Sequence, residues 1–380
     1  MTNIVIAAYY RTPFQPATKG TLAKVRPDEM AAQLARGLIA KTKIDAGTLE
    51  DLMMGCAFPE GEQGFNVARL VEQLADIPIS VPGVTINRFC GSSMTGIHMA
   101  AGQIAAGAGD AFLCMGVESM SRIPMGGFNP MPHPELAAKN EGAYMAMGIT
   151  AENVAKKFQI SRDAQDEFAM NSHTKAAAAR DAGRLQNEIM PVSDPKSGAV
   201  IMDDGCIRAE TNLAKLAELK PSFLEGGVVT AGTSSPLTDG ASAVIVCTEE
   251  YAKKNGLTPL ARIKAFAAAG CDPTIMGMGP VPAVKKALER AKLKISDIDI
   301  FELNEAFAAQ ALAVIRELGM DINKVNLDGG AIAIGHPLGA SGARITGKAA
   351  ALLSRERKKY AVASMCIGGG QGVATVLEAI

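Results

Sequence analysis

NRFCGSSM, residues 87–94, joins a strand-like run to a helix-like run and places a cysteine at the turn between them. Residues 81–86 are apolar and β-rich, whereas residues 95–106 are small and apolar, as in a buried helix. Cys90 is therefore expected near a helix N-terminus, where free backbone N–H groups and the helix dipole lower the pKa of a thiol. Such a cysteine is a candidate nucleophile, although a buried and inert thiol is the commoner case.

Strand-like and helix-like runs alternate on both sides of this turn. Before residue 120, strand-like runs at 4–6, 84–86 and 111–115 are interleaved with helix-like runs at 28–40, 66–76 and 95–106. From about residue 258 the alternation resumes over 261–268, 281–293, 299–303, 306–318, 328–334, 342–353, 361–366 and 373–377. This order is typical of βαβ units and predicts an α/β fold with a mostly parallel sheet.

Two parts of the chain share the same order of expected secondary-structure elements. Residues 84–87 lead through Cys90 to a helix-like run and a strand, and residues 325–328 lead in the same order through His336. A duplicated domain would bring both turns close to one pseudo-twofold axis, so that Cys90 and His336 could meet. Residues 121–236, with loops and a charged helical region at 149–183, indicate an insertion, after which the strand-like run 243–247 returns to the first sheet.

Three further positions could carry chemistry. His336 lies in a glycine-dense stretch, where an imidazole near Cys90 could accept the thiol proton. Cys366 precedes a glycine run and could move protons, while the backbone N–H of Gly368 could join that of Cys90 in an oxyanion hole. Asn304 could hold a water or a substrate oxygen. The alternatives are a core histidine, a redox-paired or buried cysteine, and a helix N-cap asparagine.

Composition excludes several classes of function. The chain has 380 residues, 48% of them hydrophobic and 20% charged, with a formal net charge of -1 and a pI near 6.5. Nucleic acid is therefore not expected as a partner. Seven cysteines without CxxC spacing argue against a disulfide framework and a zinc site, so no metal is expected. The N-terminus looks like a strand rather than a leader, and no apolar run reaches membrane-spanning length, so we expect a cytoplasmic protein without a transmembrane segment.

Four motifs taken together resemble the thiolases. They are CGS at 90–92, NEAF at 304–307, GHP at 335–337 and CIGGG at 366–370, and the likeness extends over nearly the whole chain. The resemblance implies a five-layer αβαβα thiolase fold with duplicated mixed-sheet halves and an inserted loop domain over the substrate site. The expected domains are an N-terminal half at 1–120 and 237–257, a loop domain at 121–236 and a C-terminal half at 258–380.

The resemblance also implies an acyltransferase reaction. Cys90 would attack the keto carbon of a 3-ketoacyl-CoA and become acylated as acetyl-CoA departs, and a second CoA would then remove the acyl group in a ping-pong cycle. His336 would activate Cys90 and, with a water on Asn304, stabilise the enolate, while Cys366 would exchange protons. Amides of Cys90 and Gly368 would form the oxyanion hole. Coenzyme A is a substrate here, and no permanently bound cofactor is expected.

Residues that would bind CoA and the acyl chain follow from the same resemblance. Ser235 matches the family's pantetheine-contacting serine, and Lys220 stands where many members have arginine, which would make it a point charge for a phosphate. Further candidates are Phe223, Ala231, Leu237, Met147, Met276 and Phe307. Methionines in these positions could equally be core residues.

Several alternatives remain open within and outside the family. Short-chain thiolases usually carry a histidine where Ala146 stands, so the degradative, fatty-acid β-oxidation branch is favoured over an acetoacetyl-CoA thiolase. A β-ketoacyl synthase, a non-catalytic acyl-CoA or lipid-binding member and a redox dithiol protein are the other readings. The resemblance implies a homodimer or tetramer and leaves open a complex with a hydratase/dehydrogenase subunit.

Overall fold

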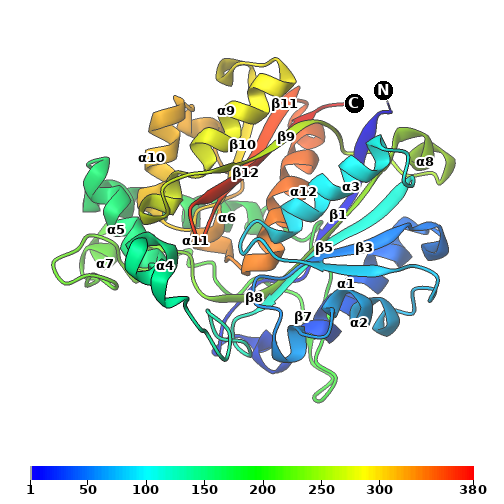
Figure 1. Cartoon of the computed structure of the whole chain (residues 1–380), viewed down its shortest axis with the longest axis horizontal. Coiled ribbons are helices and arrows are strands. Elements are labelled where there is room, and N and C mark those ends of the chain that lie inside the picture. The colour runs from blue at the N-terminus through cyan, green and yellow to red at the C-terminus, as the bar shows by residue number, and fades with distance from the viewer. Residues whose placement is uncertain (1) are drawn as a thin grey trace.

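The protein, described by a computed structural model over residues 2–380, is built around one long sheet to which both halves of the chain contribute (Figure 1). The first half supplies, in spatial order, β4 (Gly83–Ile86), β3 (Asp51–Gly55), β5 (Ala111–Ser119), β8 (Thr238–Thr248) and β1 (Ile4–Arg11). The second half continues with β9 (Ala261–Gly270), β12 (Gln371–Glu378), β11 (Tyr360–Ile367) and β10 (Ile300–Leu303). The halves join where Val5 and Ile6 pair with Arg262 and Ala261.

The two halves share one strand order. In the first half, the strands lie in the order third, second, fourth, fifth and first along the chain. The second half has the same order once Val325, which bridges Phe301 of β10 in parallel, is counted as its third strand. The turn with Cys90 and the turn with His336 therefore hold equivalent positions, as the internal resemblance predicted.

Helices form layers on either side of each half-sheet. α3 (Ser92–Ala105) and α12 (Leu338–Glu356) pack against each other between the two halves, as Figure 1 shows. α1 (Pro27–Thr42) and α2 (Val67–Leu74) cover the outer face of the first half. α9 (Pro280–Ala291) and α10 (Ala308–Leu318) cover the outer face of the second. This is the expected five-layer αβαβα arrangement.

The central strand β5 shows how the layers are held together. Its side chains alternate between faces, with Phe112 and Cys114 in the core around α3 and α12, and Leu113 and Met115 in the core beneath α1. Every residue of β5 is buried. Burial of each large apolar side chain contributes about 1.5–3 kcal/mol, so a strand that is apolar on both faces belongs between two helix layers.

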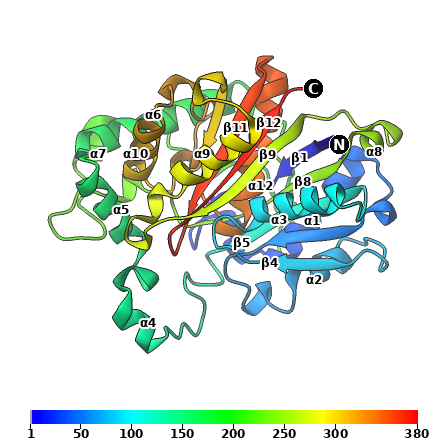
Figure 2. The same ribbon diagram turned by 45° about the horizontal axis from the view of Figure 1, so that its top comes forward.

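The helices of residues 121–236 lie mainly beside the second half, with α4 (Pro134–Lys139) projecting away from the sheet in Figure 2, whereas residues 189–201 pack against α1 and β1 of the first half. The elements of this segment include α5 (Met147–Lys157), α6 (Arg162–Asp181), α7 (Leu213–Ala217), and a hairpin of β6 (Val192–Ser193) and β7 (Val200–Ile201). The helical region expected at 149–183 is thus two helices. The chain then returns through β8 between β1 and β5.

The remaining elements are short. β2 (Gln15–Pro16) pairs with β8, α8 (Glu249–Lys254) follows β8, and α11 (Ala331–Ile334) precedes His336. Short 3-10 helices lie at Thr21–Lys24, Ala46–Thr48, Gly61–Gln63, Glu141–Tyr144, Ala231–Thr233, Pro273–Met278, Ile295–Asp297 and Ile322–Lys324. Within residues 2–380, no helix is both long and apolar enough to cross a membrane.

The prediction of a mostly parallel sheet was wrong. β8 is antiparallel to both β1 and β5, and β12 is antiparallel to β9 and β11. The hairpin between β11 and β12 explains part of this difference, because a connection as short as residues 368–370 can join only antiparallel strands. The internal resemblance also suggested a strand at 325–328, where only Val325 pairs, and the run at 328–334 is not a strand, because Gly329 adopts φ +83° and turns the chain into α11.

Candidate active site

A cavity of about 220 Å³ brings together Cys90, His336 and Cys366. The three side chains come from the turn before α3, the turn before α12 and the end of β11. The rest of the wall is almost entirely apolar and includes residues of the inserted segment; it consists of Met120, Met125, Ala146, Met147, Gly148, Phe223, Ser234, Ser235, Pro236, Leu237, Met276, Ala306, Phe307 and Leu338. An apolar cavity with a few convergent reactive groups is the usual form of a small-molecule site.

The turn that carries Cys90 has an unusual backbone. Phe89 adopts φ 42°, a left-handed conformation that costs a non-glycine residue roughly 1–2 kcal/mol. A Cβ on Gly91 would come within 2.5 Å of the Ile367 side chain, so glycine is needed for α3 to approach β11. The backbone N–H groups of Gly368 and Cys90 lie close to the Cys90 sulfur and lower the pKa of this thiol, Gly368 more strongly than Cys90. Two donors thus meet at the place where charge would develop on an adduct of this thiol.

The thiol of Cys90 is not held as a thiolate, contrary to the expectation of a lowered pKa. Burial raises the pKa of Cys90 to about 12, and the nearby Glu118 carboxylate acts in the same direction. The hydrogen bond from Gly368 lowers the pKa but does not offset burial, because loss of solvent around a thiolate is the larger effect. Cys90 therefore needs a base at the moment of attack.

His336 is fixed by hydrogen bonds on every side. Its backbone N–H donates to Thr238 Oγ1 at 3.0 Å, and its Nδ1 lies 2.6 Å from Ser341 Oγ. Since the Ser341 hydroxyl donates to the Pro337 carbonyl at 3.0 Å, it must accept from Nδ1–H. The lone pair of the neutral imidazole is therefore on Nε2. Burial, with a contribution from Arg344, lowers the pKa of His336 to about 3, so the ring is neutral near pH 7.

Asn304 is not a helix cap. α10 begins at Ala308 with Phe307 in the capping position, so the N-cap reading of Asn304 was wrong. Instead its Nδ2 lies 3.3 Å from Nε2 of His336 and donates to the ring lone pair. Its Oδ1 is buried and has no hydrogen-bond partner among the described residues. That oxygen is an acceptor available to a water or a substrate group.

Cys366 is a protonated thiol at the end of β11. It is 1% exposed, and burial raises its pKa well above the usual range, with the Cys90 and Cys271 sulfurs adding to the effect. A thiol with a raised pKa holds its proton near pH 7 and can deliver it to a carbanion formed beside it. The cavity thus contains a neutral base and two protonated thiols.

Most of the predicted substrate-binding residues line this cavity. Ser235, Phe223, Leu237, Met147, Met276 and Phe307 are all part of its wall. Phe223 packs edge-on against Phe307 with ring centroids 5.9 Å apart. Lys220 and Ala231 do not line it; both are exposed, and Lys220 lies in a shallow groove formed by residues 220–226. Phe223 belongs to both the groove and the cavity, so the two adjoin.

Sequence reasoning missed the residues that position this site. Ser341 follows His336 by five residues in the same glycine-dense stretch, so its nearness could have been noticed. Thr238 could not have been found, because it comes from β8, far away in sequence. The same holds for Glu118, whose buried carboxylate accepts from the backbone N–H groups of Ala57 and Gly339 and so ties the first turn of α12 to β5.

The titratable side chains of the described chain, residues 2–380, form no group of three His, Cys, Asp or Glu residues that could hold a metal ion.

Comparison with protein families gives a consistent result over the whole chain. The model of the thiolase N-terminal domain matches residues 4–250, and that of the thiolase C-terminal domain matches residues 257–379. The chain is 49% identical to the 3-ketoacyl-CoA thiolase of Pseudoalteromonas translucida and 45% identical to that of Bacillus subtilis, with all of each chain covered.

Solved structures show the same likeness in three dimensions. The human mitochondrial 3-ketoacyl-CoA thiolase superposes with a TM-score of 0.91 at 39% identity, covering 100% of this chain and 99% of the other. The Bacillus anthracis acetyl-CoA acetyltransferase has the same TM-score at 37% identity and the same coverage. The fold therefore has close counterparts among solved structures over the whole length of the chain.

Proposed function

Because the chain belongs to the thiolase family, we propose that it is an acyltransferase that cleaves 3-ketoacyl-CoA with CoA, giving acetyl-CoA and a shortened acyl-CoA. The observation that carries this proposal is the meeting of Cys90, His336 and Cys366 in one cavity, where the backbone N–H groups of Gly368 and Cys90 lie close to the Cys90 sulfur.

In the first step, the Cys90 thiol must lose its proton as it attacks the substrate. The sulfur of Cys90 attacks the keto carbon while its proton passes to Nε2 of His336, which carries the ring lone pair and gives up its hydrogen bond from Asn304 as it accepts the proton. The oxygen of the tetrahedral adduct accepts from the N–H groups of Cys90 and Gly368. Since the imidazole and the thiol are both neutral at rest, the proton transfer and the attack are coupled.

Cleavage then produces an acyl thioester on Cys90 and the enolate of acetyl-CoA. Protonated His336 and a water held by the free Oδ1 of Asn304 stabilise the enolate oxygen. The thiol of Cys366 gives its proton to the enolate carbon, which completes acetyl-CoA and leaves a thiolate.

The second half-reaction regenerates the enzyme. The Cys366 thiolate takes the proton of an incoming CoA, and the CoA sulfur attacks the thioester on Cys90. The acyl group moves to CoA, and Cys90 leaves as a thiolate that recovers its proton from His336. Two successive half-reactions on one nucleophile give ping-pong kinetics.

Substrate contacts are distributed between the cavity and the adjoining groove. We assign the pantetheine arm to Ser235 and Leu237, and a CoA phosphate to the exposed Lys220 beside Ala231. Apolar side chains of Met147, Met276, Phe223 and Phe307 would then contact the acyl chain. We further propose that residues 121–236 act as a loop domain over the site, between an N-terminal half (1–120 and 237–257) and a C-terminal half (258–380).

The cellular setting is also a proposal. Ala146, in the place where short-chain members usually carry histidine, favours the fatty-acid β-oxidation branch. Family resemblance supports a cytoplasmic homodimer or tetramer that uses CoA as a substrate without a bound cofactor, with a hydratase/dehydrogenase subunit as a possible partner.

The test is CoA-dependent consumption of C4 and C16 3-ketoacyl-CoA, with Cys90→Ala and Cys271→Ser compared with the wild-type enzyme. Cys271 is a partly exposed thiol outside the cavity wall and is the matched control. Turnover of C16 that is lost only in Cys90→Ala, with an acyl adduct on Cys90 in the mass spectrum, supports the proposal. Turnover of C4 alone moves the assignment to acetoacetyl-CoA, and no turnover by folded enzyme rejects catalysis.

A further inference from the structure

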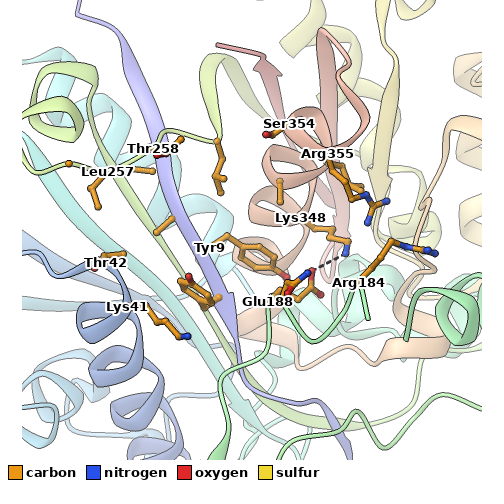
Figure 3. A pocket seen from close by; sticks show the side chains of 18 residues that line it. Tyr9, Lys41, Thr42, Arg184, Glu188, Leu257, Thr258, Lys348, Ser354 and Arg355 are labelled. Carbon is orange, nitrogen blue, oxygen red and sulfur yellow. Dashed lines mark hydrogen bonds and ion pairs between the residues drawn. The ribbon is translucent and has the colours of Figure 1, made fainter. Parts of the chain in front are cut away.

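A second and larger cavity, of about 550 Å³, lies at the other end of α12 (Figure 3). Leu338 at the start of α12 lines the active-site cavity and Arg355 at its end lines the second, about 26 Å away at the rise of an α-helix. The cavity exists because β1 pairs with β9 only at Val5 and Ile6 and has a register shift before Ala8, so the two halves diverge beyond that point.

The wall of this cavity is rich in cations. Lys41, Arg184, Lys348 and Arg355 line it, against a single carboxylate, Glu188. Just behind the wall, one buried carboxylate, Asp328, accepts ion pairs from Arg184, Lys348 and Arg355. The wall of the cavity itself thus carries four cations and one carboxylate.

The carboxylate oxygens here are already in use. Glu188 accepts from Arg11 through one oxygen and from Lys348 through the other. Both oxygens of Asp328 likewise accept from the three cations that meet there. The two carboxylates therefore offer no unoccupied oxygen to a bound cation.

Several donors, in contrast, have no acceptor among the described residues. Arg184 contacts Asp328 only through Nε, which leaves its two terminal nitrogens without a partner, and Lys41 makes no ion pair. The hydroxyl of Tyr9 is buried and unpartnered in a side chain that is 5% exposed. In Figure 3 the Tyr9 ring points across the cavity toward Glu188 and Lys348. A buried polar group without a partner costs about 1–3 kcal/mol, so a ligand that accepts from it is favoured.

We propose that this cavity binds a phosphate-bearing anion whose phosphate oxygens accept from the terminal nitrogens of Arg184, while the hydroxyl of Tyr9 and the ammonium of Lys41, farther along the wall, donate to the other polar groups of the ligand. A guanidinium fork suits phosphate oxygens, and hydroxyl and ammonium donors add to it. Leu257, Leu260, Ala351 and Leu352 supply an apolar wall, so the fitting ligand class is a phosphate monoester with a small organic body. This site is separate from the proposed reaction and does not depend on it.

The experiment uses the full-length protein without CoA, because CoA carries a phosphate monoester that would compete for this cavity, and the variants below distinguish the cavity from the contacts near Lys220. Inorganic phosphate and glycerol phosphate are titrated separately by calorimetry, with chloride adjusted to keep the ionic strength constant. We expect saturable binding at one site per chain, tighter for the ester, and a rise in the unfolding temperature with ligand concentration. Binding of inorganic phosphate alone would overturn the ester assignment, and no saturable binding of either probe would overturn the site.

Substitutions of the residues that line the second cavity test whether phosphate binds there. Arg184→Ala should weaken phosphate binding at least tenfold, and Asp328 keeps Lys348 and Arg355 as partners, so the fold should be retained. Lys41→Ala, at the exposed rim, and Tyr9→Phe should weaken it by a smaller factor. The matched control is Arg180→Ala, in the last turn of α6 just before the turn that carries Arg184 and paired with Asp181, which should bind as the wild type does. Unchanged affinity in both Arg184→Ala and Lys41→Ala would place the anion elsewhere and reject the proposal, whatever the thiolase activity.

Discussion

The turn with Cys90 and the turn with His336 hold equivalent positions in the two halves, yet their surroundings differ. Cys90 is partly exposed to the cavity, and backbone N–H groups are its donors. His336 is 4% exposed and is held through its backbone N–H, Nδ1 and Nε2. A nucleophile must be accessible to its substrate, whereas a general base must keep one tautomer. The two turns hold equivalent positions in the fold, and the different residues around each turn suit it to one of these roles.

The residues that precede these turns differ in the same way. Asn87 is exposed, donates to the Ala57 carbonyl and accepts from the N–H of Phe89. Its counterpart Asp328 is buried and holds three cations. The first turn is therefore held by neutral hydrogen bonds, and the second by charge.

The largest expected effect tests the nucleophile. Cys90→Ala should lower kcat/KM by at least about four orders of magnitude, because no other side chain can form the acyl intermediate. Cys271→Ser should retain most activity. A Cys90→Ala enzyme that still forms an acyl adduct would show that the first turn does not carry the nucleophile.

The second largest effect is expected from His336, the proposed general base. His336→Gln should lower kcat by about two to four orders of magnitude, the usual range for loss of a general base. Cys90 should still be alkylated by iodoacetamide, more slowly than in the wild type at the same pH. Wild-type turnover by His336→Gln would mean that another group takes the thiol proton.

Removal of the buried Asp328 carboxylate should lower the stability of the fold rather than the rate of catalysis. Asp328→Asn should lower the free energy of unfolding by about 3–5 kcal/mol at pH 7, because Arg184 loses its ion-pair partner and Lys348 and Arg355 each lose one of two. Burial raises the pKa of Asp328, but Arg355 and Lys348 outweigh burial and hold it far below its usual value.

The sign of the pH dependence follows from that depressed pKa. The stabilisation by Asp328 is fully present above the unfolded-state pKa, near 4, and is lost as pH falls toward the lower folded-state value. Denaturant unfolding of wild type and Asp328→Asn should therefore converge below about pH 4. A difference that stays constant down to pH 2 would contradict the charge-based account.

A smaller effect is expected from Ser341, which positions His336 and does not itself react. Ser341→Ala should lower kcat about ten- to a hundredfold with little change in KM, because Nδ1 loses the acceptor that sets the tautomer. Nitrogen NMR shifts of His336 should move toward a mixture of tautomers. Reduced kcat with an unchanged tautomer would assign Ser341 a purely structural role.

The smallest effect is expected on the first turn. Asn87→Ala should cost about 1 kcal/mol of unfolding free energy, the usual worth of an exposed pair of neutral hydrogen bonds. This loss should not depend on pH between 3 and 8, in contrast with Asp328→Asn, because no titratable group is removed. Denaturant unfolding at both ends of that range checks it.

Much of this protein could be predicted from its sequence, because the signals are local. Periodicity located α3, α12 and the strands beside them, and the cysteine and histidine turns stood out by their glycines and rare residue types. The repeated order of these elements also predicted the duplicated plan. The same residues carried the resemblance that the family comparison then established.

Only the tertiary structure decided the strand directions, the protonation of the site and its supporting contacts. Antiparallel β8 and β12, the partner Thr238 on His336 and the exposure of Lys220 depend on residues far apart in the chain. The pKa of Cys90 shows the physical reason. The helix start is a local feature, but the burial that raises this pKa comes from both halves and the inserted segment, and loss of solvent outweighs nearby backbone dipoles.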